Sequence, residues 1–239
     1  MTDYYTHDIT MYPFSVIFRG GGYNWPFKIR LLFAIRKALG GHRSVSYAQA
    51  FPKELYPIKI EDLPPTLQLE FQKRINEAER FGFEKVVLHK SDTIGCQLRY
   101  LCILVNRERD TLWNISFIHA TLGSKSKSVW AAGLRTDLKD GTILLTCEEL
   151  TIPKYLIKPN HKIEILSKGA TVDSILRHHQ NRLCMIPRDQ LSIIPKEDIL
   201  GFLLNRSQID FRDFLASGVF RIITDQEVDK LKKVRFDFE

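Results

Sequence analysis

The 239 residues are 44% hydrophobic and 26% charged, which fits an ordinary folded protein and excludes disordered and fibrous classes. No stretch approaches the roughly 18 to 20 apolar residues that a membrane-spanning helix needs. The first residues also lack the basic start and apolar middle of a signal peptide, so we expect a cytoplasmic protein. The net charge of +7 favours an anionic ligand or an acidic protein partner over a basic one.

The positive charge is concentrated near the N-terminus. No acidic residue lies between Asp8 and Glu54, whereas this stretch holds Arg19, Lys28, Arg30, Arg36, Lys37, Arg43 and Lys53. A second basic excess lies over residues 154–168. Each segment is a candidate surface for an anion.

Three consecutive glycines, 20–22, precede the first predicted helix. They lack the lysine and hydroxyl residue of a phosphate-binding P-loop and the spacing of a dinucleotide-binding loop. One alternative is an anion site at the free amides of the helix start, formed by Arg19, Gly21, Gly22 and Lys28. The other is a plain glycine turn.

The segment 26–39 is a predicted helix, because proline suits its first turn and Gly40-Gly41 suits its end. Its apolar residues cover most of the helical circumference, so we expect burial on more than one side. Trp25 and Phe27, which alternate with basic residues, could instead stack on nucleic-acid bases, but we favour the core for them.

A second, amphipathic helix is predicted over 66–81, with apolar residues at Leu67, Phe71, Ile75 and Ala78 and an end at Gly82. A strand follows at 84–90. Four further strand-length segments lie over 97–106, 111–123, 128–138 and 141–150, separated by short polar breaks. These breaks are too short for crossover helices, so we predict an α+β fold with an antiparallel meander of about four to six strands flanked by helices.

A short strand at 163–166 leads into a third helix, 172–185, which carries His178 and His179. Adjacent histidines lie about 100 degrees apart on a helix and cannot share a metal as an i, i+4 pair does. They are either weak catalytic candidates or polar contacts of the helix. We divide the chain into an α+β domain, 1–190, and a mainly helical C-terminal portion, 191–239, packed on the same core.

Other chemistry is sparse in the sequence. The residues His89, Ser91 and Asp92 are of the types found in catalytic triads, but they are adjacent rather than assembled by the fold. His119 lies in a strand pattern typical of a hydrogen-bonded sheet residue. The four cysteines form no C-x-x-C pair and indicate reduced, mostly buried thiols. We predict no metal site and no cofactor.

Part of the chain, about residues 60–183, resembles a group of uncharacterised bacterial proteins. The likeness rests on the runs "DLPPTLQLEFQKRINEAERFGFEKV", "LRTDLKDGTILLT" and "ILRHHQNRL". It implies a bacterial origin and one α+β unit. These proteins have no assigned activity, so the resemblance carries no functional residue to this chain.

Three functional hypotheses follow. The first is a cytoplasmic, non-catalytic binding module whose basic surfaces meet an anionic ligand or an acidic partner. The second is a hydrolase or phosphate-handling enzyme that uses His178 or His179. The third is binding of nucleic acid without sequence preference through the basic N-terminal segment.

Overall fold

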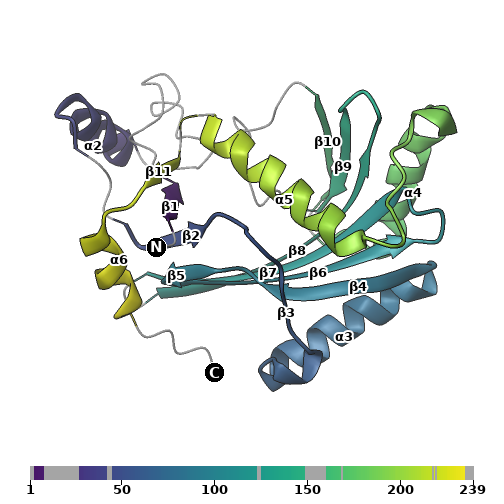
Figure 1. The fold of residues 1–239 in the computed structure, drawn as a ribbon, viewed down its shortest axis with the longest axis horizontal. Helices are drawn as coiled ribbons and strands as arrows, with labels where there is room; N and C mark the ends of the chain where they lie inside the picture. The colour runs from purple at the N-terminus through teal and green to yellow at the C-terminus, as the bar shows by residue number, and fades with distance from the viewer. Residues whose placement is uncertain are drawn as a thin grey trace.

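The computed structural model describes residues 3–7, 27–41, 45–122, 125–148, 160–167, 169–216, 218 and 220–234. Within them the chain is a mixed α+β structure built on two sheets (Figure 1). The small sheet is antiparallel, with the strand order β11 (Phe220–Ile222), β1 (Tyr4–His7), β2 (Tyr47–Ala50) and β5 (Thr93–Gly95).

The large sheet contains the predicted meander. Its strand order is β10 (His161–Ile165), β9 (Ile143–Cys147), β8 (Lys125–Asp137), β7 (Thr111–Leu122), β6 (Gln97–Asn106), β4 (Phe83–Lys90) and β3 (Tyr56–Pro57). Neighbours are antiparallel except β10, which runs parallel to β9. The α+β class is confirmed. The prediction of four to six antiparallel strands is wrong in that this sheet has seven strands and is mixed. The connection 148–160 is long enough for a parallel return, unlike the short breaks before it.

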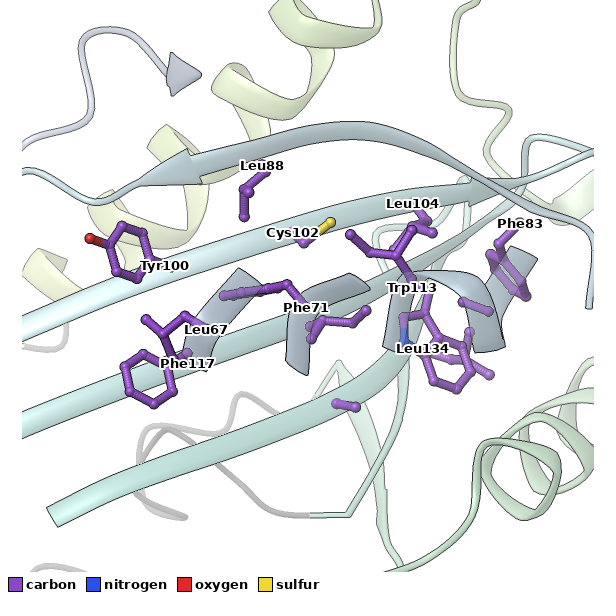
Figure 2. Close-up of a cluster of buried hydrophobic side chains, with 14 of the residues drawn as sticks. Leu67, Phe71, Phe83, Leu88, Tyr100, Cys102, Leu104, Trp113, Phe117 and Leu134 are labelled. Atoms are coloured by element: carbon purple, nitrogen blue, oxygen red, sulfur yellow. The ribbon is translucent and has the colours of Figure 1, made fainter. Parts of the chain in front are cut away.

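One face of the large sheet packs on α3 (Pro65–Arg80). The predicted stripe is confirmed, because Leu67, Phe71, Ile75 and Ala78 are all buried. Figure 2 shows Leu67 and Phe71 lying against side chains of the strands, among them Cys102, Trp113 and Phe117. Ring contacts between Phe83 and Trp113 complete this main core.

The opposite face packs on α5 (Ile199–Ala216), and Figure 1 shows α3 and α5 on opposite sides of the central strands. The expectation of a sheet flanked by helices is thus confirmed. The sequence predicts a helix opened by Pro195 and a separate segment after it, but α5 is one helix of 18 residues. It begins after Asp198, whose carboxylate accepts a hydrogen bond from the Gly201 amide at 3.0 Å.

The C-terminal portion is not simply helical. α6 (Asp225–Lys232) begins with a capping box of Thr224 and Glu227 and packs on the small sheet. Between α5 and α6, however, β11 pairs with β1, so a C-terminal strand lies beside the N-terminal one. The mainly helical character expected of 191–239 is not confirmed.

The remaining helices within the described residues are α2 (Phe27–Ala38), α4 (Val172–Leu183) and the short 3-10 turns η2 (Ile60–Asp62) and η4 (Arg188–Gln190). α2 ends before Gly40, which adopts a φ of +69 degrees as the predicted helix stop requires. Figure 1 shows α2 and α4 at opposite ends of the molecule.

Candidate functional site

The two adjacent histidines of α4 have opposite environments. α4 is capped by Thr171, whose hydroxyl accepts a hydrogen bond from the Ser174 amide, and its apolar side rests on β8 and β9. His179 lies on the sheet side and is 0% exposed. His178 lies on the outer side, where its side chain is 47% exposed. The rotation of about 100 degrees between neighbours on a helix separates them.

Both ring nitrogens of His179 are occupied by threonine hydroxyls from the sheet. Nδ1 lies 3.0 Å from Thr146 Oγ1 on β9, and Nε2 lies 3.0 Å from Thr136 Oγ1 on β8. Further hydrogen bonds extend this contact in both directions. We call the whole set the His179 network: Arg182, Thr146, His179, Thr136, Thr111 and Asp110.

The proton positions in the His179 network follow from its two ends. Arg182 can only donate, and it does so to Thr146 at 2.8 Å. At the other end the Thr111 hydroxyl donates to Asp110 at 2.8 Å. Because each hydroxyl has one proton, Thr136 donates to Thr111 and His179 Nε2 donates to Thr136. In a neutral imidazole this places the single ring proton on Nε2 and leaves Nδ1 to accept from the Thr146 hydroxyl.

Electrostatics agree with this assignment. Burial, with a smaller contribution from the nearby Arg182 guanidinium, lowers the pKa of His179 from 6.5 to about 3. A neutral, fully enclosed ring with both nitrogens occupied holds α4 against the sheet. In this conformation it cannot reach a substrate.

His178 pairs with a carboxylate at the surface. Its Nδ1 lies 2.8 Å from Glu164 Oε1 on β10, and the other oxygen of this carboxylate is 4.0 Å from Arg182 Nε. Arg182 also donates to the backbone carbonyls of Leu145 and Lys162, so it joins α4 to both β9 and β10. The carboxylate orients the half-exposed His178 ring, as in general-base pairs.

The other sequence candidates occupy structural positions. His119 is buried and its Nδ1 lies 2.7 Å from the Ser128 hydroxyl. Burial, followed by the charge of Arg99, lowers the pKa of His89 to about 4. Asp92, near it in sequence, accepts a hydrogen bond from the Tyr4 hydroxyl at 3.5 Å. None of these contacts assembles a triad among the described residues.

The expectation of mostly buried thiols is confirmed only in part. Cys102 and Cys147 are buried, Cys96 is half-buried and Cys184 is exposed. Burial raises the pKa of the Cys102 thiol to about 12, so this thiol stays protonated at neutral pH.

The predicted anion site falls mostly on residues that the structure does not describe. Arg19, Gly21 and Gly22 lie outside the described residues, as do residues 154–159 of the second basic segment. Lys28 is described, and it is exposed in the first turn of α2. The joint site therefore stays a prediction.

An exposed apolar surface on α2 is the main feature that the sequence reasoning missed. The prediction of burial on more than one side is wrong, because Ala34 is the one buried residue of this helix. Leu39 is 81% exposed, Phe27 65% and Leu32 60%. We call the exposed large apolar side chains of this helix, together with Leu39 directly after it, the α2 face: Phe27, Ile29, Leu31, Leu32, Ile35 and Leu39. The even spread of apolar residues around α2 signalled burial, although it could equally have signalled a contact surface.

A cavity of about 430 Å³ lies elsewhere, at the junction of the two sheets and α6. Lys90, Ile94, Tyr100, Leu231 and Lys232 are among its lining residues, and neither histidine of α4 is. Among the described residues, no group of three or more histidine, cysteine or acidic side chains is arranged to hold a metal ion.

Comparisons with protein-family models, with curated proteins and with solved structures found no match to this chain. The resemblance to bacterial proteins of unassigned activity thus stays a prediction. Within the described part of the chain, every helix is too short or too polar to cross a bilayer.

Proposed function

We propose that this chain is a non-catalytic binding module that attaches to an anionic partner through α2. The observation that carries the proposal is the inverted burial of this helix. Most of its large apolar side chains are exposed, while Arg30, Phe33 and Lys37 are half-buried and each takes part in a polar or ring contact. A surface helix normally places its apolar side against the core.

The free energy available to a partner is considerable. Fully burying one exposed leucine or isoleucine side chain contributes about 1.5 to 3 kcal/mol. Contiguous exposed apolar surface on a soluble protein typically marks a site of interaction. The α2 face offers several such side chains on one short helix.

Charge sets the kind of partner. α2 contains no acidic residue, and Lys28 and Arg36 are exposed beside the apolar side chains. The chain as a whole carries a net charge of +7. An anionic partner gains from these cations, whereas a cationic one is repelled.

The test is a panel of three anionic probes: heparin, a soluble acidic amphipathic peptide of glutamate and leucine, and vesicles that contain phosphatidylglycerol. We expect the wild-type protein to bind at least one probe. The double variant Leu32→Gln/Leu39→Gln should bind that probe at least about 10-fold more weakly than the wild type, since two apolar contacts are lost.

The matched control is Leu69→Gln/Met185→Gln, which removes two side chains that are 75% and 85% exposed outside α2. This control should bind like the wild type. A protein that binds none of the three probes, or whose binding is unchanged by the α2 substitutions, would contradict the proposal.

The enzymatic alternative retains one supporting observation, the contact between His178 and Glu164. A hydrolase of this kind would lose activity in a His178→Gln variant and keep it in His179→Gln if that variant folds. Binding of nucleic acid is supported less well. Phe27 is exposed and can stack on a base, contrary to the expectation that it belongs to the core, but the other side chains of the α2 face are aliphatic and cannot.

A further inference from the structure

We infer that the partner of the α2 face is an anionic lipid surface, on which α2 lies flat at the level of the headgroups. This inference rests on the proposed binding function and assigns its partner class. It concerns attachment to one side of a bilayer, because a helix of 12 residues is only about 18 Å long and cannot span it.

The shape of the exposed surface fits a flat partner. With about 100 degrees between successive residues, Phe27, Leu31, Ile35, Leu39 and Leu32 fall on one continuous arc of roughly 140 degrees. The half-buried residues Phe33, Lys37 and Arg30 lie on the other side, at about 240 to 300 degrees. The buried Ala34 lies at the edge of the arc beside Phe27, and Ile29 lies about 60 degrees beyond Leu32. Figure 1 shows α2 at the edge of the molecule, so this arc can meet a broad surface.

The same geometry disfavours a protein groove. A groove that receives an amphipathic helix encloses much of its circumference. Part of α2 is already occupied, because Ala34 is buried and Phe33 is half-buried. A partner can therefore contact α2 from one side only, as a lipid surface does.

A second copy of this chain is also disfavoured. Two α2 faces packed together would bring Lys28 and Arg36 of one copy near the same residues of the other, with no acidic residue on either helix to compensate. Like charges placed together at an interface weaken association. An anionic bilayer surface attracts these cations instead.

Lys28 limits how deeply the helix can enter. On the helical projection it lies within the apolar arc, at about 100 degrees from Phe27. Its ammonium group must stay among the phosphates while its methylene stem lies beside the neighbouring apolar side chains. The helix is thus suited to an interfacial position about 5 to 10 Å into the boundary between headgroups and acyl chains, not to the bilayer centre.

The experiment is co-sedimentation of the full chain with vesicles of phosphatidylcholine alone and of equal parts phosphatidylcholine and phosphatidylglycerol. We expect binding to the anionic vesicles that is at least about 10-fold stronger than to the neutral ones, since each cation near the surface strengthens attraction. Raising the salt concentration to about 0.5 M should weaken it, because the charges are screened.

Two pairs of variants separate apolar from charged contributions. Leu32→Gln/Leu39→Gln should reduce binding to anionic vesicles about 10-fold or more, whereas the control Leu69→Gln/Met185→Gln should not. Lys28→Gln/Arg36→Gln should reduce it by about 10- to 30-fold. Its control, Lys73→Gln/Arg80→Gln, removes two exposed charges from α3, so the two variants have the same net charge.

The outcomes distinguish this inference from the proposed function. Equal binding to both vesicle types, or binding that the α2 variants leave unchanged, would overturn the lipid assignment. If the acidic peptide binds through α2 and the vesicles do not, the binding module stands and the lipid inference fails. If no probe binds, both fail. Circular dichroism of each variant verifies that the fold is intact.

Discussion

His179 can hold α4 to the sheet only as a neutral residue. Protonation would place a second N–H on Nδ1, directed at Thr146 Oγ1. That hydroxyl already accepts a hydrogen bond from Arg182, so two cationic donors would converge on one oxygen and the Thr146 proton would lose its acceptor. Acid should therefore destabilise the folded state, because the charged imidazole fits the unfolded chain better than it fits these partners.

The sign and range of this effect follow from the shifted pKa. The folded imidazole has a pKa of about 3, against 6.5 for the ordinary residue. Between these values the unfolded state binds more protons, so stability falls as the pH is lowered, by up to about 1.4 kcal/mol per pH unit. The contribution of the neutral His179 ring to folding stability is fully present above about pH 6.5. We expect the titration of His179 to lower the free energy of unfolding by about 2 kcal/mol between pH 7 and pH 5.

Urea unfolding at pH 7 and pH 5 measures this loss. His179→Gln should be less stable than the wild type at pH 7 by about 1 to 3 kcal/mol, because buried hydroxyls lose a partner, and less sensitive to acid. His89 is present in both proteins, so its own titration cancels in the difference. His178→Gln is the exposed control. If His179→Gln does not fold, an NMR titration of the wild type decides: a His179 pKa near 6.5 would contradict the neutral assignment.

At the scale of elements, a partly buried ion cluster positions α5 on the sheet. Arg135 on β8 lies 3.0 Å from Asp137 and 2.6 Å from Asp210 of α5, and Arg206 of α5 pairs with Asp137. Burial alone would lower the pKa of Arg135, but the two carboxylates outweigh it and raise this pKa. Each carboxylate thus compensates a guanidinium that would otherwise be buried without a partner.

Removing one charge from this cluster should loosen α5. Asp210→Asn keeps the shape of the side chain but leaves part of the Arg135 charge uncompensated, so we expect a loss of about 1 to 3 kcal/mol in the free energy of unfolding. The control Asp229→Asn changes an exposed residue of α6 and should stay within about 0.5 kcal/mol. Equal effects of the two substitutions in urea unfolding would show that the cluster does not stabilise α5.

The limits of α2, α3 and the meander strands could be predicted from local signals. Which side of a helix is buried could be predicted only where its apolar residues lie on a single side. The stripe of α3 has a single apolar side, so Phe71 had to face the core. α2 is apolar around most of its circumference, and periodicity does not tell which side is covered. The His179 network lay beyond sequence reasoning, because Thr111, Thr136 and Thr146 come together only when β7, β8 and β9 pair.

The arrangement of the whole molecule depends on contacts between distant segments. The small sheet joins short strands from the N-terminus, the middle and the C-terminus, and each is too short to give a clear periodic pattern. Its β5 passes directly into β6 of the large sheet through Cys96, whose amide donates to the Ser46 carbonyl at 2.8 Å. This junction therefore connects the two sheets.

Gly95, immediately before Cys96, should be the position where the junction tolerates a side chain least. Its φ is +93 degrees, and a Cβ atom there would lie 2.4 Å from the Ser46 carbonyl oxygen. Gly141 offers a matched control, because its φ is +82 degrees but a Cβ atom there would meet nothing within 4 Å. Gly141→Ala should cost about 1 to 2 kcal/mol of stability from the left-handed backbone alone.

Gly95→Ala should cost about 1 to 3 kcal/mol beyond that, because the β2 backbone must also move away. Urea unfolding of the two variants measures the difference. Hydrogen exchange provides a second readout, since the amides of β2 and β5 should lose protection in Gly95→Ala while those of β7 and β8 keep it. Equal stability of the two variants, with unchanged hydrogen-exchange protection of β2, would show that the backbone around Gly95 accommodates a side chain without loss of structure. The close approach of β5 to β2 would then not be what holds the two sheets together.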